Sequence, residues 1–270
     1  MRRIARQLAA LAATVGLASA CTNVASEGPA TSPEGNPSVS VNAAAAAVMP
    51  KDLQSTGEIV FASDASYAPF EYFDTDNRTM IGFDIQLTDA LSQVLGVEAK
   101  HVNAGFDTIL PGLQSKKYDA AVSALGITDE RRQIVDFVPY LSMGTGLAVP
   151  SGNPDGLSLE DATTLCGKTV SGLKGSIQTI SILPELSMDC EGAGEKPIRV
   201  ANFPTQNEAN LALTSGRADA IMADSVPLAY QGEQAGDAFE LAEGEDYEPV
   251  QIGVAVPNDS DLGPALAAAM

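Results

Sequence analysis

Three short segments of the chain carry side chains that could bind a small charged molecule. Asp64-Ala-Ser-Tyr-Ala-Pro-Phe-Glu71 holds an acid and an aromatic ring, Gly82-Phe-Asp84 follows it, and Thr128-Asp-Glu-Arg131 supplies an arginine. A guanidinium group binds a carboxylate through two parallel hydrogen bonds, an aspartate binds a cation, and an aromatic ring covers an apolar stem. The three together are typical of a site for a small zwitterion. Taken alone, Arg131 has a simpler alternative, which is a surface ion pair with Asp129 or Glu130.

The elements that must position these segments follow a repeating β/α pattern. After residue 58, short β-rich runs alternate with helical patterns, which favours a parallel sheet with helices between its strands. In this first series we predict strands over 58–62, 98–102 and 119–123, and helices over 84–95 and 106–114, the second helix being broken early by Pro111.

A second series follows the turn-rich segment 150–156. We predict strands over 168–171, 198–201 and 220–223, helices over 176–186 and 205–216, and a last strand over 250–256 that returns to the first series. The pattern predicts an α/β protein of two lobes joined by two crossing segments, one of them through Gly144-Thr-Gly146. Clefts between such lobes commonly bind ligands.

Composition limits the class of partner. The chain has 270 residues, 45% of them hydrophobic, and a formal net charge of −20. The apolar content suffices for a packed core, whereas phosphate binding needs a basic surface, so we exclude nucleic acid as a partner. The negative charge solvates the surface and favours cationic or zwitterionic ligands.

Residues 1–20 have the features of a signal peptide. Arg2, Arg3 and Arg6 precede an apolar run over 8–17 that is too short to span a bilayer stably. Ala18-Ser-Ala-Cys21 then resembles a bacterial lipoprotein signal, so we predict that Cys21 carries lipid and anchors the protein to the cell membrane. Such signals usually have a large aliphatic residue where Ala18 stands, so a simply cleaved secretory signal is the alternative.

Residues 21–55 are predicted to be the lipid anchor and a disordered linker, because 22–50 is rich in Ala, Ser, Pro, Gly and Asn. If Cys21 is lipidated, Cys166 and Cys190 remain in an oxidising compartment. We predict that they form a disulfide, with two buried free thiols as the alternative.

Other patterns that suggest chemistry are incomplete. His101 is the only histidine and no Cys/His cluster exists, so we expect no metal, no cofactor and no histidine-based catalysis. Gly167-Lys-Thr169 lacks the earlier glycine of a phosphate loop. Asp74-Thr-Asp-Asn-Arg78 lacks the glycine and glutamate of a calcium loop and is predicted to be a hairpin turn.

Taken together, the motifs resemble the extracellular solute-binding proteins of polar amino-acid ABC transporters, the bacterial family 3 type, in lipoprotein form. The resemblance covers residues 58–269 and implies the periplasmic-binding-protein (Venus-flytrap) fold. It places lobe 1 over 56–147, lobe 2 over 148–249 and a return to lobe 1 over 250–270. It also implies that the family's usual end lies about one helix pair beyond residue 270.

The resemblance also assigns roles to single residues. Arg131 would hold the ligand carboxylate, Tyr67 would lie over the ligand stem, and Phe106 would form the second wall. Asp64 matches the acid that meets the side-chain cation in members that bind basic amino acids. Asp224 matches the acid that binds the α-ammonium, with an N-cap of the next helix as its alternative role.

Further ligand contacts are implied at a strand end in lobe 1 and at a helix start in lobe 2, where free N–H groups suit a carboxylate. At Ala124 and Gly126 many members carry hydroxyl residues for the ligand ammonium, so backbone carbonyls would have to bind it here. At Ile177 many members carry a threonine, so one hydroxyl is lost from the carboxylate site. The implied residues are Ser123, Ala124 and Gly126 in lobe 1 and Gly175, Ser176 and Ile177 in lobe 2.

The implied function is capture of a polar L-amino acid between the lobes and its delivery to an ABC permease, by a monomer outside the cytoplasm. Asp64 and the overall acidity favour a cationic side chain. One rival is a periplasmic dehydratase on the same scaffold, for which Asp64 is the one good acid or base. A second rival is a ligand-sensing module, which we would expect to continue into a transmembrane and signalling segment.

Overall fold

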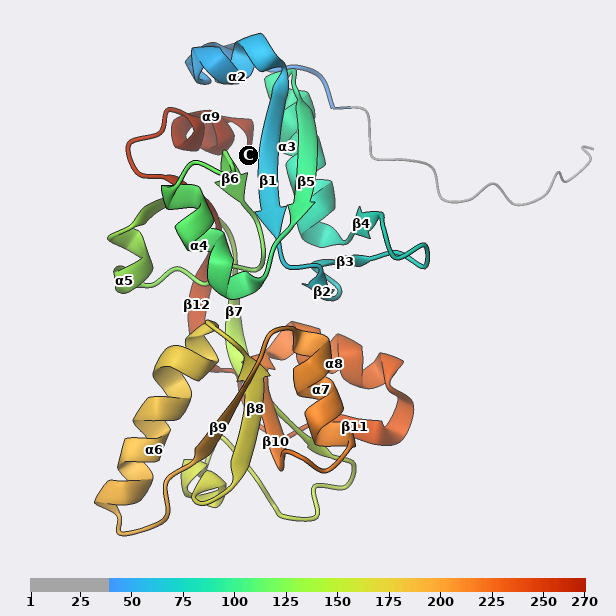
Figure 1. The fold of residues 1–270 in the computed structure, drawn as a ribbon, viewed down its shortest axis with the longest axis vertical. Helices are drawn as coiled ribbons and strands as arrows, with labels where there is room; N and C mark the ends of the chain where they lie inside the picture. Colours follow the sequence, from blue (N-terminus) through green and yellow to red (C-terminus); the bar gives the residue numbers. More distant parts are fainter. Residues whose placement is uncertain (1–38) are drawn as a thin grey trace, which may run out of the picture. The chain divides into compact units, whose positions relative to one another are not determined.

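A computed structural model describes residues 39–270 (Figure 1). The signal peptide predicted over 1–20 and the lipidation predicted at Cys21 lie outside these residues.

Lobe 1 is built on parallel strands with helices between them, as predicted. Strand β1 pairs with β5 on one side and with β6 on the other. A small antiparallel sheet, β2-β3-β4, lies between β1 and α3 in the chain, and its turn over 74–79 is the predicted hairpin. The elements are β1 (Glu58–Ser63), β2 (Ser66–Tyr67), β3 (Glu71–Phe73), β4 (Met80–Ile81), α3 (Phe83–Leu95), β5 (Glu98–Asn103), α4 (Phe106–Gln114), β6 (Ala120–Ala121) and α5 (Asp129–Arg132).

Lobe 2 repeats this arrangement with parallel strands in the order β10-β8-β9. The helix predicted from residue 205 begins as expected, since the Thr205 side chain accepts a hydrogen bond from the Glu208 N–H at the start of α7. The elements are β8 (Thr169–Leu173), α6 (Leu183–Gly192), β9 (Arg199–Phe203), α7 (Gln206–Thr214), β10 (Ala220–Asp224), α8 (Ser225–Gln234) and β11 (Phe239–Leu241), with short helical turns at Ala162–Leu165, Gln178–Ile182 and Gly236–Ala238.

Two long antiparallel strands belong to both lobes, β7 (Val135–Pro150) and β12 (Tyr247–Pro257). Residues 135–145 of β7 pair with β12, while residues 145–148 pair with β10 of lobe 2 (Figure 1). The segment around Gly144-Thr-Gly146 therefore crosses between the lobes, as predicted. A β-carbon on Gly146 would lie 3.0 Å from the Ser225 Cα, so glycine permits this close approach. The precise lobe boundaries remain a prediction, since both strands run through them.

Helix α4 differs from the prediction, because it continues through Pro111. An internal proline removes one backbone hydrogen bond and costs about 3 kcal/mol. Ile109 and Leu113 flank the proline and are both fully buried, and burial of such side chains contributes roughly 1.5–3 kcal/mol each. Packing on both sides of Pro111 therefore outweighs the lost bond.

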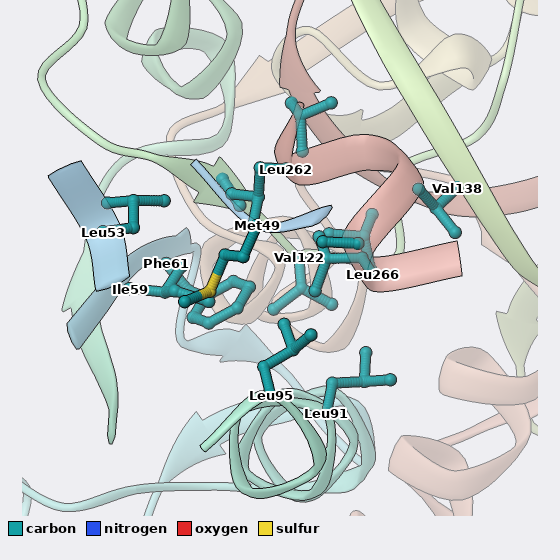
Figure 2. Close-up of a cluster of buried hydrophobic side chains, with 14 of the residues drawn as sticks. Met49, Leu53, Ile59, Phe61, Leu91, Leu95, Val122, Val138, Leu262 and Leu266 are labelled. Carbon is teal, nitrogen blue, oxygen red and sulfur yellow. The ribbon is translucent and has the colours of Figure 1, made fainter. Parts of the chain in front are cut away.

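The predicted linker also differs from the structure. Residues 43–56, which the sequence placed mostly in a disordered linker ending at 55, form helices α1 (Ala43–Val48) and α2 (Lys51–Thr56). Figure 2 shows Met49 and Leu53 packed among the core side chains of lobe 1, near Ile59 and Phe61. Burial of these two side chains offsets the ordering entropy of an otherwise Ala-rich segment.

The last helix, α9 (Leu262–Ala269), completes the same core. Leu262 and Leu266 are fully buried and lie in the cluster with Leu91 and Leu95 of α3 (Figure 2). The helix after β12 thus packs on the same core as α3.

The predicted disulfide between Cys166 and Cys190 is present in the structure and joins the segment before β8 to α6. Because it closes a loop with a sequence separation of 24, the chain-entropy relation gives it about 3.5 kcal/mol of stabilisation. We expect a reductant to lower the free energy of unfolding by about this amount in urea titrations of protein shown beforehand to be oxidised. Identical midpoints with and without reductant would contradict this expectation.

Candidate ligand-binding site

A cavity between the lobes collects most of the predicted contact residues. Lobe 1 contributes its wall from β2, the start of α4, the segment after β6 and helix α5. Lobe 2 contributes the end of β8, the start of the next helix and the end of β10. The lining residues are Tyr67, Phe106, Ala124, Gly126, Arg131, Leu173, Ser176, Ile177, Gln178 and Asp224.

Arg131 is the cation of this cavity. Thr128 caps helix α5 by accepting the Arg131 N–H, and the side chain is only 6% exposed. Its guanidinium donates to the carbonyl oxygens of Gly126 (2.7 Å) and Gly175 (3.0 Å) and lies over the Phe106 ring at 5.6 Å. A guanidinium has five N–H donors, so others remain for a ligand.

The alternative of a surface ion pair for Arg131 does not hold. Among the described residues Arg131 forms no ion pair with a carboxylate, and Asp129 and Glu130 are both exposed. Burial lowers the pKa of Arg131 to about 10, while the charge of Asp224 raises it. The group is therefore positively charged at neutral pH.

Asp224 is the anion of the cavity. Its carboxylate accepts hydrogen bonds from the Tyr67 hydroxyl (2.8 Å) and from the Gln178 amide (3.0 Å), and the Asp224 N–H donates to the Tyr67 oxygen (3.1 Å). Asp224 does stand at the predicted N-cap position of helix α8, but its side chain makes no capping hydrogen bond. Tyr67 thus joins lobe 1 to the acid of lobe 2.

Burial raises the pKa of Asp224 to about 6. Hydrogen bonds from Tyr67 and Gln178 and the positive charge of Arg131 oppose this shift. A ligand cation placed beside the carboxylate would favour its charged form further. The cavity therefore presents one buried cation and one buried anion.

Three predicted residues do not line the cavity. Asp64 is 4% exposed, and its carboxylate accepts the Phe106 N–H (2.9 Å) at the first residue of α4. Ser123 donates its hydroxyl to Glu71 (2.7 Å). Gly175 contributes only its carbonyl, to Arg131. Asp64 therefore lies next to the cavity wall, and Ser123 and Gly175 hold neighbouring groups.

Ala124 is held by an acid behind the cavity. Its backbone has a φ of +41°, unusual for a residue with a β-carbon, and its N–H donates to Asp84 (2.8 Å). Asp84 also accepts the Tyr140 hydroxyl (2.7 Å). Burial, and after it the negative charge of Asp84, raises the pKa of Glu71 well above its usual value. These buried acids support the cavity from within lobe 1.

The sequence did not single out two residues that line the cavity, Leu173 and Gln178. Leu173 ends β8, and Gln178 begins the helical segment that follows, donating to both Asp224 and Thr145 (2.9 Å). Their positions in the sequence could have predicted them, because ligand contacts gather at the carboxyl ends of parallel strands and at the starts of the helices that follow.

Gly126 allows the two lobes to meet. A β-carbon at this position would overlap the Cδ1 atom of Ile177, which projects from lobe 2. The Gly126 carbonyl, which the resemblance assigned to the ligand ammonium, instead accepts from Arg131.

The described residues hold no group of three or more His, Cys, Asp or Glu side chains suited to a metal ion. Within the same residues, no helix has both the length and the apolar character to cross a bilayer.

Two α/β lobes joined by two strands, with opposite buried charges facing a cavity between them, define a two-lobed small-ligand-binding protein. The sequence model for bacterial extracellular solute-binding proteins, family 3, matches residues 59–226. The chain therefore belongs to this family.

Individual relatives agree with the family. The chain is 32% identical to an arginine-binding protein of Corynebacterium glutamicum, over 83% of this chain and 72% of the relative. It is 34% identical to an L-arginine-binding protein of Pseudomonas aeruginosa, over 74% and 76%.

Solved structures confirm the predicted fold. The holo form of ArgBP from T. maritima matches with a TM-score of 0.70 at 29% identity, over 81% of this chain and 91% of that one. An ancestral amino acid-binding protein described as a precursor of cyclohexadienyl dehydratase matches with a TM-score of 0.71 at 27% identity, over 81% and 90%.

Proposed function

We propose that this protein captures an L-amino acid with a cationic side chain, arginine first, and delivers it to an ABC permease. The observation that carries the proposal is that a buried guanidinium, Arg131, and a buried carboxylate, Asp224, line the same cavity. An α-amino acid carries a carboxylate and an ammonium on one carbon atom, and these two buried charges would bind one each. Relatives named for arginine support the choice of side chain.

Binding would favour the closed arrangement of the lobes. The lining residues come from both lobes, so a ligand contacts all of them only when the lobes are closed. We infer that this closed form docks on the permease as a monomer. We further propose that a lipidated Cys21 holds the protein at the outer face of the cell membrane.

A thermal-shift scan of the full-length chain against the twenty L-amino acids and L-ornithine tests the proposed function. A ligand at 100 times its dissociation constant stabilises the folded state by about 2.7 kcal/mol. We expect a selective shift with arginine and smaller shifts with other cationic amino acids. A cooperatively melting protein that shifts with none of them would contradict the proposal.

Asp64 provides a test of the side-chain preference. Its carboxylate accepts the Phe106 N–H, and the amide oxygen of asparagine can accept the same bond, so Asp64→Asn removes the charge and retains this contact. We expect roughly tenfold weaker binding of arginine, about 1.4 kcal/mol, and unchanged binding of glutamine, by calorimetry. Equal losses for both ligands would show that Asp64 acts on the fold of the wall and not on the cation.

We propose a binding role in preference to an enzymatic one. The curated relatives described above are named as binding proteins. We expect no consumption of prephenate or arogenate by the purified chain, and measurable turnover of either would favour the enzyme.

A further inference from the structure

The two lobes also meet through a polar contact outside the cavity. In lobe 1, the Ser66 hydroxyl oxygen accepts the Gln206 N–H (3.1 Å), and the Ala68 carbonyl accepts the Gln231 amide (2.9 Å). Gln206 begins α7 and Gln231 lies in α8, both in lobe 2. Ser66 and Ala68 stand on either side of Tyr67, which covers the cavity. None of these four residues lines the cavity itself.

Three amide side chains of lobe 2 form a directed chain of hydrogen bonds that ends at Ala68. Gln206 donates to the Asn210 oxygen (2.9 Å), Asn210 donates to the Gln231 oxygen, and Gln231 donates to the Ala68 carbonyl. We name this set, Gln206, Asn210 and Gln231, the amide relay. An amide has distinct donor and acceptor ends, so each link fixes the orientation of the next.

Because the relay is buried, a wrong orientation of one of its amides would cost free energy. Gln206 is fully buried and Gln231 is 9% exposed. A buried amide that loses its hydrogen-bond partner still bears the free-energy cost of having left water. If the Gln231 amide rotated so that its oxygen faced the Ala68 carbonyl oxygen, this hydrogen bond would be lost, so that orientation is strongly disfavoured. The Gln231 oxygen is already occupied by Asn210, which leaves its NH₂ group for the other lobe.

We propose that Gln231, oriented by Asn210 and Gln206, is a positioning residue for ligand binding. It holds the Ser66–Ala68 segment, and with it Tyr67, against lobe 2 and so stabilises the closed arrangement without contacting the ligand. Its contribution to affinity is consequently the same for every ligand that the closed form binds. This inference rests on the proposed function for its affinity test.

The first test compares Gln231→Glu with Gln234→Glu in the full-length chain. Both are in α8 and change charge equally, but Gln234 is exposed and makes no contact in this relay. In Gln231→Glu a carboxylate oxygen faces the Ala68 carbonyl, so the contact becomes repulsive. We expect about tenfold weaker binding of L-arginine, L-lysine and L-histidine, by the same factor for each, and no change in Gln234→Glu. Affinities equal to those of Gln234→Glu, or a loss confined to one ligand, would overturn the proposal.

The second test needs no ligand. As the first residue of α7, Gln206 has no partner for its N–H within the helix, so protection of that amide depends on Ser66 across the lobes. We expect hydrogen exchange at this amide, followed by NMR, to be at least tenfold faster in Gln231→Glu than in Gln234→Glu. Equal exchange in the two variants would refute the relay. If the unsubstituted chain binds no amino acid, the proposed function fails and this exchange measurement still decides the inference.

Discussion

Replacing Arg131 with alanine should weaken binding of L-arginine roughly 100-fold or more. The guanidinium is nine-tenths or more buried, already bonded to the carbonyls of Gly126 and Gly175, and placed over Phe106. Hydrogen bonds to a charged group contribute about 1.5–3 kcal/mol each, and a bidentate carboxylate contact makes two of them. Titration calorimetry at neutral pH measures the loss.

Arg132→Ala is the matched control, because the neighbouring residue in α5 is exposed. It should bind arginine as the unsubstituted chain does. Arg131→Lys keeps the charge but lacks the planar fork, so we expect an intermediate loss. If Arg131→Ala folds normally and binds like Arg132→Ala, the carboxylate assignment is wrong.

Replacing Asp224 with asparagine should weaken binding at least tenfold at pH 7 and change how affinity depends on pH. The pKa of Asp224 is raised to about 6, and the ligand ammonium favours the ionised carboxylate. Above pH 6 the carboxylate is charged and affinity is full. Below pH 6 affinity falls, approaching tenfold per pH unit, until the lower pKa of the bound state is reached.

Calorimetry between pH 5 and pH 8 on both proteins separates this effect from other groups that titrate nearby. Asp84, whose pKa is also raised to about 6, stays in both proteins and does not line the cavity. The expected result is about tenfold weaker binding at pH 5 than at pH 7 in the unsubstituted chain and a flatter profile in Asp224→Asn. Parallel profiles in the two proteins would exclude Asp224 as the ammonium partner.

Much of the fold followed from sequence because its signals are local. The alternation of β-rich runs and helical patterns after residue 58 predicted most strands and helices of both lobes, and the helix predicted from residue 205 does begin at Thr205. It did not predict the long strand β7 or helix α8. Tertiary packing decided the exceptions. Met49 and Leu53 order an Ala-rich segment whose composition predicted a linker, and β6 is confined to Ala120–Ala121 by its pairing with β1.

The cavity shows the same division between local and tertiary information. Arg131, Tyr67 and Asp224 were predicted from motifs, and all three line it. Asp64 was predicted in the same way, but its carboxylate accepts the Phe106 N–H. This contact depends on where α4 begins relative to β1, which the local sequence does not specify. Gln178 was missed because a single glutamine carries no signal until folding places it beside Asp224.

The most direct test of the central claim is calorimetry of the full-length chain with L-arginine, agmatine and Nα-acetyl-L-arginine. Agmatine lacks the carboxylate that Arg131 would hold, and the acetyl derivative lacks the charged ammonium that Asp224 would hold, while both retain the guanidinium. The predicted result is one arginine bound per chain and at least 100-fold weaker binding of both derivatives. Equal binding of agmatine and arginine would contradict the role of the two buried charges, as would the absence of arginine binding to a folded chain.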